Sequence, residues 1–183
     1  MGLLEGVVRT RVGYMGGTTA DPTYETLGDH TETVQLDYDP TVISYEELLT
    51  AFFGSHDCAV GGMKRQYMSV VFFHDAEQER LAREAKAAME TRLGKTVQTN
   101  ILPAATFYMA EDYHQKHTLQ GYESFMREFR VMYPEFADIV GSTAAARVNG
   151  YLHGYGTEGQ LRRELDSLGI SEEAKNRLLF PFE

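Results

Sequence analysis

The fold of this chain can be worked out from one stretch, Val12-Gly13-Tyr14-Met15-Gly16-Gly17. The residues from Val7 to Tyr14 are rich in β-branched side chains, which favour a strand, and the flexible pair Gly16-Gly17 predicts a turn after it. A second strand is predicted from Thr33 to Tyr38, where apolar and polar residues alternate. Asp39-Pro40 ends that strand, because the residue before a proline avoids regular helical geometry and proline has no N–H to donate.

Two helices carry clear signals at their ends. Ser44, with Glu47 three residues later, forms a capping box, so we predict a helix that starts at this point and buries its apolar side. Asp75 is the expected N-cap of a longer helix from about Ala76 to Leu93, and Gly94 is its expected C-cap. Both helices are predicted to pack on strands.

Further strands and helices follow along the chain. Met68 to Phe73 is a continuous apolar run typical of a central strand, and another strand is predicted from Val97 to Leu102. The C-terminal part is mainly helical, and Thr157 with Gln160 predicts a second capping box there. Strands and helices alternate early and helices dominate late, which predicts a mixed α/β (α+β) two-layer domain with a helical C-terminal extension.

Composition excludes several classes of function. The chain has 183 residues, 43% of them apolar, which is enough for one ordinary packed domain. Its net charge of −10, without a long run of Lys or Arg, argues against nucleic acid and anionic membrane as partners. No apolar run approaches the ~20 residues that span a bilayer. Cys58 is the only cysteine and cannot form an internal disulfide, so we expect a cytoplasmic protein, and we expect it to be a monomer.

Several motifs together resemble one family. The opening stretch, read with the segments that follow it, resembles peptide methionine sulfoxide reductases of the A type (MsrA), and in particular the insect-like subfamily. These segments are Asp21-Pro22-Thr23-Tyr24-Glu25, Gly28-Asp29-His30-Thr31-Glu32, Lys64-Arg65-Gln66-Tyr67 and Val148-Asn149-Gly150-Tyr151. The resemblance implies an α-β plait (ferredoxin-like) core and thiol-dependent reduction of methionine sulfoxide in proteins back to methionine.

The resemblance also assigns roles to particular residues. Glu32 matches the family glutamate that hydrogen-bonds to the sulfoxide oxygen and protonates it, and Tyr24 and Tyr67 match two tyrosines whose hydroxyls point at the same oxygen. A phenol suits this task because its ring walls an apolar pocket while its hydroxyl donates a hydrogen bond. For Glu32 to act as an acid near neutral pH its pKa must be raised, most simply by partial burial among aromatic rings.

Three further residues are secondary candidates. Cys58 follows His56-Asp57 on a loop, and it is either a buried, inert cysteine or a thiol that has taken over catalysis. Tyr113 and His30 lie in matching motifs and could contribute to the rim of the site. The spacing Glu111-x-x-His114-x-x-His117 could in principle hold a metal ion, but no second Glu-x-x-His accompanies it, so we predict no metal site and no bound cofactor.

The chain departs from the family at two points. The family nucleophile is a cysteine in a Gly-Cys-Phe-Trp-Gly motif, which this sequence does not contain, and a family aspartate is replaced by Gly62. We therefore expect residues 1–183 to form a single MsrA-type domain without its first strand and the start of its first helix, and we expect this form to be inactive. By resemblance the reductant is an external thiol such as thioredoxin. The alternatives are a non-catalytic module that binds oxidised-methionine peptides or a protein partner, and a poorly folded product.

Overall fold

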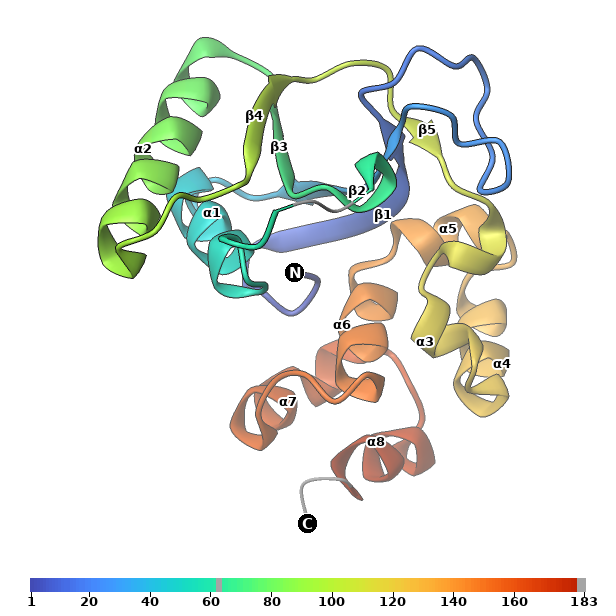
Figure 1. The fold of residues 1–183 in the computed structure, drawn as a ribbon. Coiled ribbons are helices and arrows are strands. Elements are labelled where there is room, and N and C mark those ends of the chain that lie inside the picture. Colours follow the sequence, from blue (N-terminus) through green and yellow to red (C-terminus); the bar gives the residue numbers. More distant parts are fainter. Residues whose placement is uncertain (62–63, 181–183) are drawn as a thin grey trace. The chain divides into compact units, whose positions relative to one another are not determined.

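The computed structural model describes residues 1–61 and 64–180. Their contacts group them into two compact units. The first unit contains Val12–Val34 and Pro40–Ala110, and the second contains Gly2–Arg11, Gln35–Asp39 and the chain from Glu111 onward. The mixture of strands and helices confirms the predicted α/β class (Figure 1). That all of it acts as one domain stays a prediction.

The opening stretch forms the central strand of a three-stranded sheet. Strand β1 (Val7–Met15) lies between β2 (Thr31–Tyr38) and β5 (Tyr108–Met109). β1 and β5 are antiparallel, with Gly13 opposite Met109. Tyr14 points into the core and is only 2% exposed. Both strands predicted in this region are therefore confirmed, β2 starting two residues earlier than expected.

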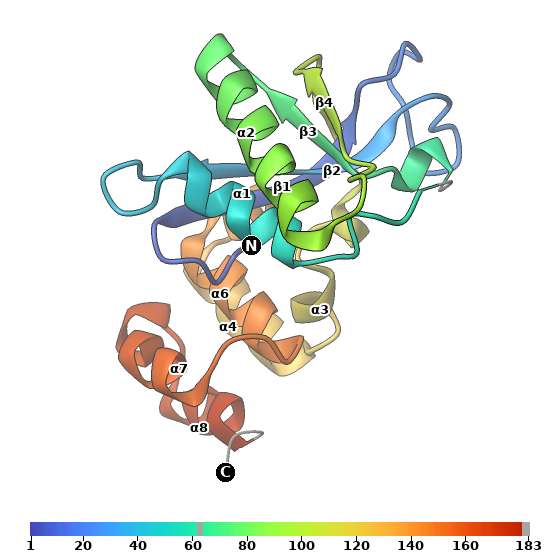
Figure 2. The ribbon, with the colours of Figure 1, turned by 60° about the vertical axis from the view of Figure 1, so that its left-hand side comes forward.

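A second sheet forms a β-α-β unit. β3 (Val70–Phe73) and β4 (Asn100–Pro103) pair in parallel, and α2 (Ala76–Leu93) connects them. Figures 1 and 2 show α1 (Tyr45–Gly54) beside α2 next to these strands. The apolar sides of the two helices and the strands share one core, as expected for a helical crossover between parallel strands.

The predicted helix ends in this unit are confirmed. The Ser44 hydroxyl accepts from the Glu47 N–H, and the Glu47 carboxylate accepts from the Ser44 N–H, which completes the capping box. The Asp75 carboxylate caps α2, and Gly94 ends it with a φ of 62°, the left-handed conformation that glycine adopts without strain.

The strand predicted from Val97 starts three residues later, at Asn100. Tertiary contacts explain the difference. The Val97 N–H donates to the Glu90 carboxylate at 3.0 Å, and the Gln98 N–H donates to the Cys58 carbonyl at 2.8 Å. Because these groups are used outside the sheet, they cannot form a ladder with β3.

The second unit is a helical assembly around one apolar core, whose most deeply buried members include Leu119, Phe129 and Leu161. Its elements are η2 (Asp112–His114), α3 (His117–Gln120), α4 (Glu123–Met132), α5 (Phe136–Gly141), α6 (Thr143–Leu152), α7 (Glu158–Glu164), η3 (Leu165–Leu168) and α8 (Glu172–Leu179). None of the described helices has the length and apolarity needed to cross a bilayer.

The second predicted capping box is only half present. The Thr157 hydroxyl accepts from the Gln160 N–H at 3.2 Å, as expected. The Gln160 side chain does not return to the Thr157 N–H, because its amide donates to the Leu3 carbonyl at 2.6 Å instead. This contact ties the beginning of the chain to α7 within the helical unit.

Close packing at Gly13 yields a first prediction. A Cβ atom at this position would overlap the Tyr108 carbonyl and the Phe107 ring. We expect Gly13→Ala to lower the free energy of unfolding by about 1–3 kcal/mol, the usual cost of overpacking. Gly54→Ala is the matched control, because Gly54 ends α1 facing open space, and Ala favours a helix by up to about 1 kcal/mol. Urea denaturation of both variants measures the difference, and equal stabilities would contradict the proposed packing.

Candidate functional site

The first candidate residue, Tyr24, lies in a β-turn within the connection between β1 and β2. The Thr26 N–H donates to the Thr23 carbonyl at 3.1 Å, and the two threonine hydroxyls lie 2.8 Å apart. Tyr24 and Glu25 are therefore the central residues of the turn, where the backbone is held by its neighbours. Tyr24 is 41% exposed.

Asp29 organises the same connection. Its carboxylate accepts from the Thr18 N–H at 2.7 Å and the Thr18 hydroxyl at 3.0 Å, and more weakly from the Thr19 N–H at 3.3 Å. The bond from the Thr18 N–H is the main reason why the pKa of Asp29 is lowered from 3.8 to about 2, against a smaller opposing effect of burial. The charged carboxylate thus joins the two ends of the loop.

His30, a secondary candidate, is only 1% exposed and also serves the loop. Its Nδ1 accepts from the Gly17 N–H at 3.2 Å, so the proton lies on Nε2, which donates to the Thr19 carbonyl at 2.8 Å. Its ring packs edge-on against Tyr108 at 5.4 Å. A Cβ at Gly17 would come within 2.6 Å of the imidazole ring, so this close approach requires glycine.

A second segment is held against this loop by Arg65. The Arg65 residue begins η1 (Arg65–Tyr67), and its guanidinium donates to the Gly16 carbonyl at 2.7 Å and to the Asp29 carbonyl. In return, the Thr31 hydroxyl donates to the Arg65 carbonyl at 2.9 Å. Charged donors make the stronger class of hydrogen bond, so η1 has a defined position relative to the start of β2.

Tyr24, Glu32 and Tyr67 come together where these segments meet. The side chains of Tyr67 and Tyr24 share a hydrogen bond. That bond is the main reason why the pKa of Tyr67 is raised above 10.0, with smaller contributions from burial and from the charges of Tyr24 and Glu32. Glu32 itself accepts a hydrogen bond from the Gln66 side chain at 2.7 Å. One carboxylate and two phenols therefore form a single cluster.

The cluster is more open than the sequence suggests. We expected Glu32 to be partly buried among aromatic rings, but its side chain is exposed. The reason is that the neighbouring tyrosines are themselves open to solvent, Tyr67 being 44% exposed. The prediction of partial burial is therefore wrong for the described chain.

The remaining candidates lie elsewhere. Cys58 is 2% exposed and packs with Phe53 and Val97 in the core between α1 and α2, which agrees with the buried alternative. Tyr113 belongs to the helical unit, where it packs against His114 at 4.1 Å, and its role stays a prediction. Gly62 lies outside the described residues. Across residues 1–61 and 64–180 no group of three or more acidic, histidine or cysteine side chains could hold a metal ion.

Three supporting residues were not singled out from the sequence. Arg65 and Gln66 belong to the motif that identified Tyr67, and Asp29 belongs to the motif that identified Glu32. Their place in these motifs was the signal that could have identified them. The sequence does not show their hydrogen-bond partners, because these are up to 49 residues away in the chain. The two tyrosine hydroxyls and the Glu32 carboxyl group can bind one small polar acceptor together. The tyrosine rings provide apolar surface beside it.

Comparisons with known proteins point to one family. A family model described as peptide methionine sulfoxide reductase matches residues 1–135. A peptide methionine sulfoxide reductase of Drosophila melanogaster is 40% identical over 172 residues, which cover 93% of this chain and 69% of that protein. Peptide methionine sulfoxide reductase A5 of Arabidopsis thaliana is 40% identical over 157 residues, 82% of this chain and 61% of that protein.

Solved structures are similar as well. Methionine sulfoxide reductase A of Corynebacterium diphtheriae matches with a TM-score of 0.57 and 34% identity, over 64% of this chain and 65% of that one. Mxr1 of Saccharomyces cerevisiae in its reduced form matches with a TM-score of 0.59 and 28% identity, over 65% of this chain and 74% of that one. The chain thus spans about two thirds of the length of the proteins it resembles.

The lowered pKa of Asp29 predicts a pH dependence of stability. Because its pKa falls from 3.8 to about 2 on folding, its stabilising contribution is present above about pH 4 and is lost as the pH falls through 2. We expect Asp29→Asn to be less stable than the parent near neutral pH and to approach it at about pH 2. Urea denaturation across this range measures the effect. Glu25→Gln, an exposed residue of the same loop, is the control, and a difference independent of pH would contradict the assignment.

Proposed function

The chain belongs to the peptide methionine sulfoxide reductase family, and from this premise we propose that it acts on oxidised methionine side chains of proteins through Tyr24, Glu32 and Tyr67. The observation that supports the proposal is the convergence of two phenols and one carboxyl group from three separate segments. A sulfoxide oxygen is a strong, small hydrogen-bond acceptor, and such a cluster is suited to bind it.

The reaction requires two electrons and two protons. Two thiol groups are oxidised to one disulfide, the sulfoxide sulfur is reduced to a thioether, and the oxygen leaves as water. As the S–O bond breaks, negative charge develops on the oxygen. The hydroxyls of Tyr24 and Tyr67 stabilise this charge by donating hydrogen bonds, and the Glu32 carboxyl group transfers a proton to the oxygen.

The hydrogen bond between the two phenols contributes to this role. Because it stabilises the protonated form of Tyr67, the Tyr67 hydroxyl keeps its proton under all physiological conditions. A hydroxyl has one proton to donate, and in this pair the Tyr67 proton is donated to the Tyr24 oxygen. The link therefore polarises Tyr24 and strengthens the hydrogen bond that Tyr24 donates to a substrate, whereas Tyr67 donates to the substrate by turning away from Tyr24. Gln66 donates a hydrogen bond to the Glu32 carboxyl group and so orients that group next to the phenols.

The thiols are assigned to an external reductant of the thioredoxin type. Cys58 is buried beneath α1 and α2, and a thiolate must reach the substrate sulfur in order to attack it. No exposed thiol lies among residues 1–61 and 64–180. In this proposal the described residues bind and protonate the sulfoxide oxygen, and the thiol that attacks the sulfur belongs to the external reductant.

Binding of a sulfoxide peptide tests the cluster. We expect a peptide with one methionine sulfoxide to bind more tightly than the same peptide with methionine. Tyr67→Phe should weaken sulfoxide binding about two- to tenfold, the effect of losing one neutral hydrogen bond, and should leave methionine binding unchanged. Isothermal titration calorimetry measures both affinities. Tyr155→Phe is the control, since Tyr155 is also an exposed tyrosine but lies in the helical unit. Equal affinities for the two peptides would contradict the proposal.

Reduction in the presence of dithiothreitol tests the assignment of the thiol. We expect Cys58→Ser to leave the rate of sulfoxide reduction unchanged, because the buried thiol does not take part. Glu32→Gln should lower the same rate, since it removes the transferable proton. Loss of all activity in Cys58→Ser, with an unchanged thermal unfolding midpoint, would show that Cys58 is the nucleophile. Tight sulfoxide binding without any reduction, also when a thioredoxin system is supplied, would favour a binding module instead.

A further inference from the structure

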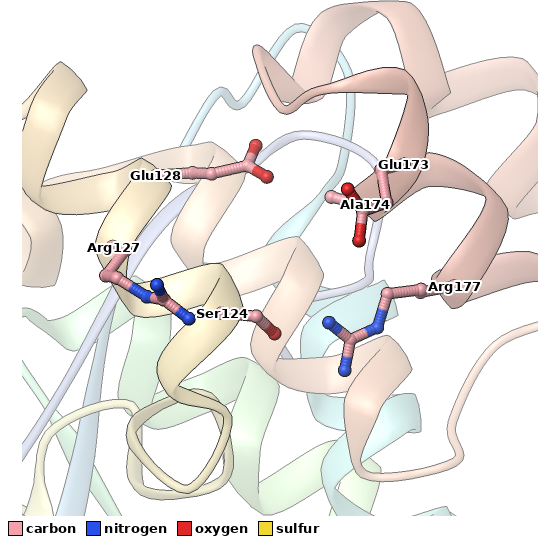
Figure 3. A pocket seen from close by; sticks show the side chains of 6 residues that line it. All are labelled: Ser124, Arg127, Glu128, Glu173, Ala174 and Arg177. Carbon is pink, nitrogen blue, oxygen red and sulfur yellow. The ribbon is translucent and has the colours of Figure 1, made fainter.

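A pocket of about 350 Å³ lies between α4 and α8 in the helical unit (Figure 3). None of the residues assigned to the proposed reaction lines this pocket, since Tyr24, Glu32 and Tyr67 belong to the first unit. Six residues line it, three from each helix: Ser124, Arg127 and Glu128 from α4, and Glu173, Ala174 and Arg177 from α8. A volume near the lower end of the range for ligand sites suits a small molecule.

The two helices are fixed to one another beside the pocket. The Glu128 carboxylate accepts from the N–H of Ser171 at 2.6 Å and from the Ser171 hydroxyl at 2.7 Å. Ser171 is the N-cap of α8, so a carboxylate from α4 satisfies the free end of α8. Ala174 is buried at the base of the contact. Glu128 is therefore committed to holding the helices together, and the pocket has a firm frame.

The other charged groups of the pocket have no such partners. Within the described residues, Arg127, Arg177 and Glu173 form no hydrogen bond or ion pair with a side chain. Arg177 lies over the Phe125 ring, 5.7 Å from its centre. Glu173 and Arg177 are four residues apart on α8, a spacing that favours an ion pair, yet they do not form one.

Charged residues elsewhere on the same helices are paired. Arg130 of α4 binds Glu123 at 2.9 Å. Lys175 of α8 binds Asp166 at 2.9 Å and Glu172 at 2.6 Å. On the described parts of α4 and α8, the charged side chains without an ion pair or side-chain hydrogen bond are therefore those that line the pocket, although this chain carries an excess of acidic groups that could neutralise the arginines.

The charges are also separated by sign. In Figure 3 the guanidinium groups of Arg127 and Arg177 lie on either side of the Ser124 hydroxyl, and the carboxylates of Glu128 and Glu173 lie along the opposite edge. Two guanidinium groups and a hydroxyl are suited to bind a carboxylate, since guanidinium donors match its two oxygens. The Glu173 carboxylate is suited to bind an ammonium group.

We propose that this pocket binds a small zwitterion of the amino-acid or short-peptide class. The carboxylate of the ligand lies between Arg127 and Arg177, and its ammonium group faces Glu173. Both signs of charge are satisfied by one molecule, whereas a simple anion would lie close to two carboxylates and a simple cation close to two guanidinium groups.

Unsubstituted glycine oligomers test the proposal, because they present the two charged ends without side chains. The probes are glycine, diglycine and triglycine, which span increasing distances between the ends. Titrations followed by ¹H–¹⁵N NMR of the full chain should show saturable shifts of backbone amides in α4 and α8 with at least one of them. N-acetylation, which removes the ammonium charge, and C-terminal amidation, which removes the carboxylate, should each weaken binding at least tenfold.

Variants assign the two ends separately. Arg127→Gln and Arg177→Gln should each weaken binding of the zwitterion at least fivefold. Glu173→Gln should do the same, but it should improve binding of the N-acetylated probe, because a repulsive carboxylate is removed. Arg130→Gln is the control, since it also removes an arginine from α4 but lies outside the pocket lining. None of these variants should alter binding of a sulfoxide peptide whose ends are acetylated and amidated.

Three results would overturn the proposal. The first is the absence of saturable shifts with all three oligomers. The second is equal binding of the N-acetylated and unmodified probes, which indicates a general anion site. The third is an effect of Arg130→Gln as large as that of Arg127→Gln, which indicates attraction by overall charge rather than by the pocket.

Discussion

The candidate site depends on two hydrogen bonds that the Arg65 guanidinium donates to the carbonyls of Gly16 and Asp29. Tyr67 follows Arg65 by two residues, and Glu32 follows Asp29 by three, so this contact fixes the distance between an acid and a phenol. Hydrogen bonds from a charged group contribute about 1.5–3 kcal/mol each, whereas ordering one residue of backbone costs about 1–2 kcal/mol. Arg65 alone therefore cannot order the long connection between β1 and β2.

Asp29 and His30 provide the remaining order within that connection. Asp29 binds the backbone at Thr18, and the buried imidazole of His30 binds the backbone at Gly17 and Thr19. The connection is thus closed on itself by its own hydrogen bonds, and Arg65 attaches the second segment to it. These local hydrogen bonds explain why a residue as exposed as Tyr24 lies in a defined turn. The polar groups of the loop satisfy one another, and Leu27 anchors the loop in the apolar core beside Tyr14.

The sequence predicted those features that depend on neighbours along the chain. The caps of α1 and α2 are local arrangements of three or four residues, and they occur as expected. Predictions failed where a distant residue competes for the same group. The Gln160 side chain is turned toward the Leu3 carbonyl and does not complete its capping box, and the Gln98 N–H of the predicted strand donates to the Cys58 carbonyl. A local pattern contains no information about such competitors.

The same distinction between local and distant determinants applies to the candidate site. Motifs that resemble those of the family identified Tyr24, Glu32 and Tyr67 as candidates, and the structure brings these residues into one cluster. Their exposure was not predictable, since it depends on which segments cover them in space. The role of Arg65 was not predictable either, because its hydrogen-bond partner Gly16 is 49 residues away in the chain. Sequence therefore indicated the chemical groups better than their environment.

At the pocket between α4 and α8, the overall charge of the protein selects the ligand. The chain carries a net charge of −10, and a free anion that approaches it meets repulsion at distances up to the screening length of about 8–10 Å. A zwitterion has no net charge and meets no such barrier. Inside the pocket its two ends are close to Arg127, Arg177 and Glu173, and there local attraction outweighs the distant field. An acidic protein can thus keep two arginines open for a carboxylate and still exclude most anions.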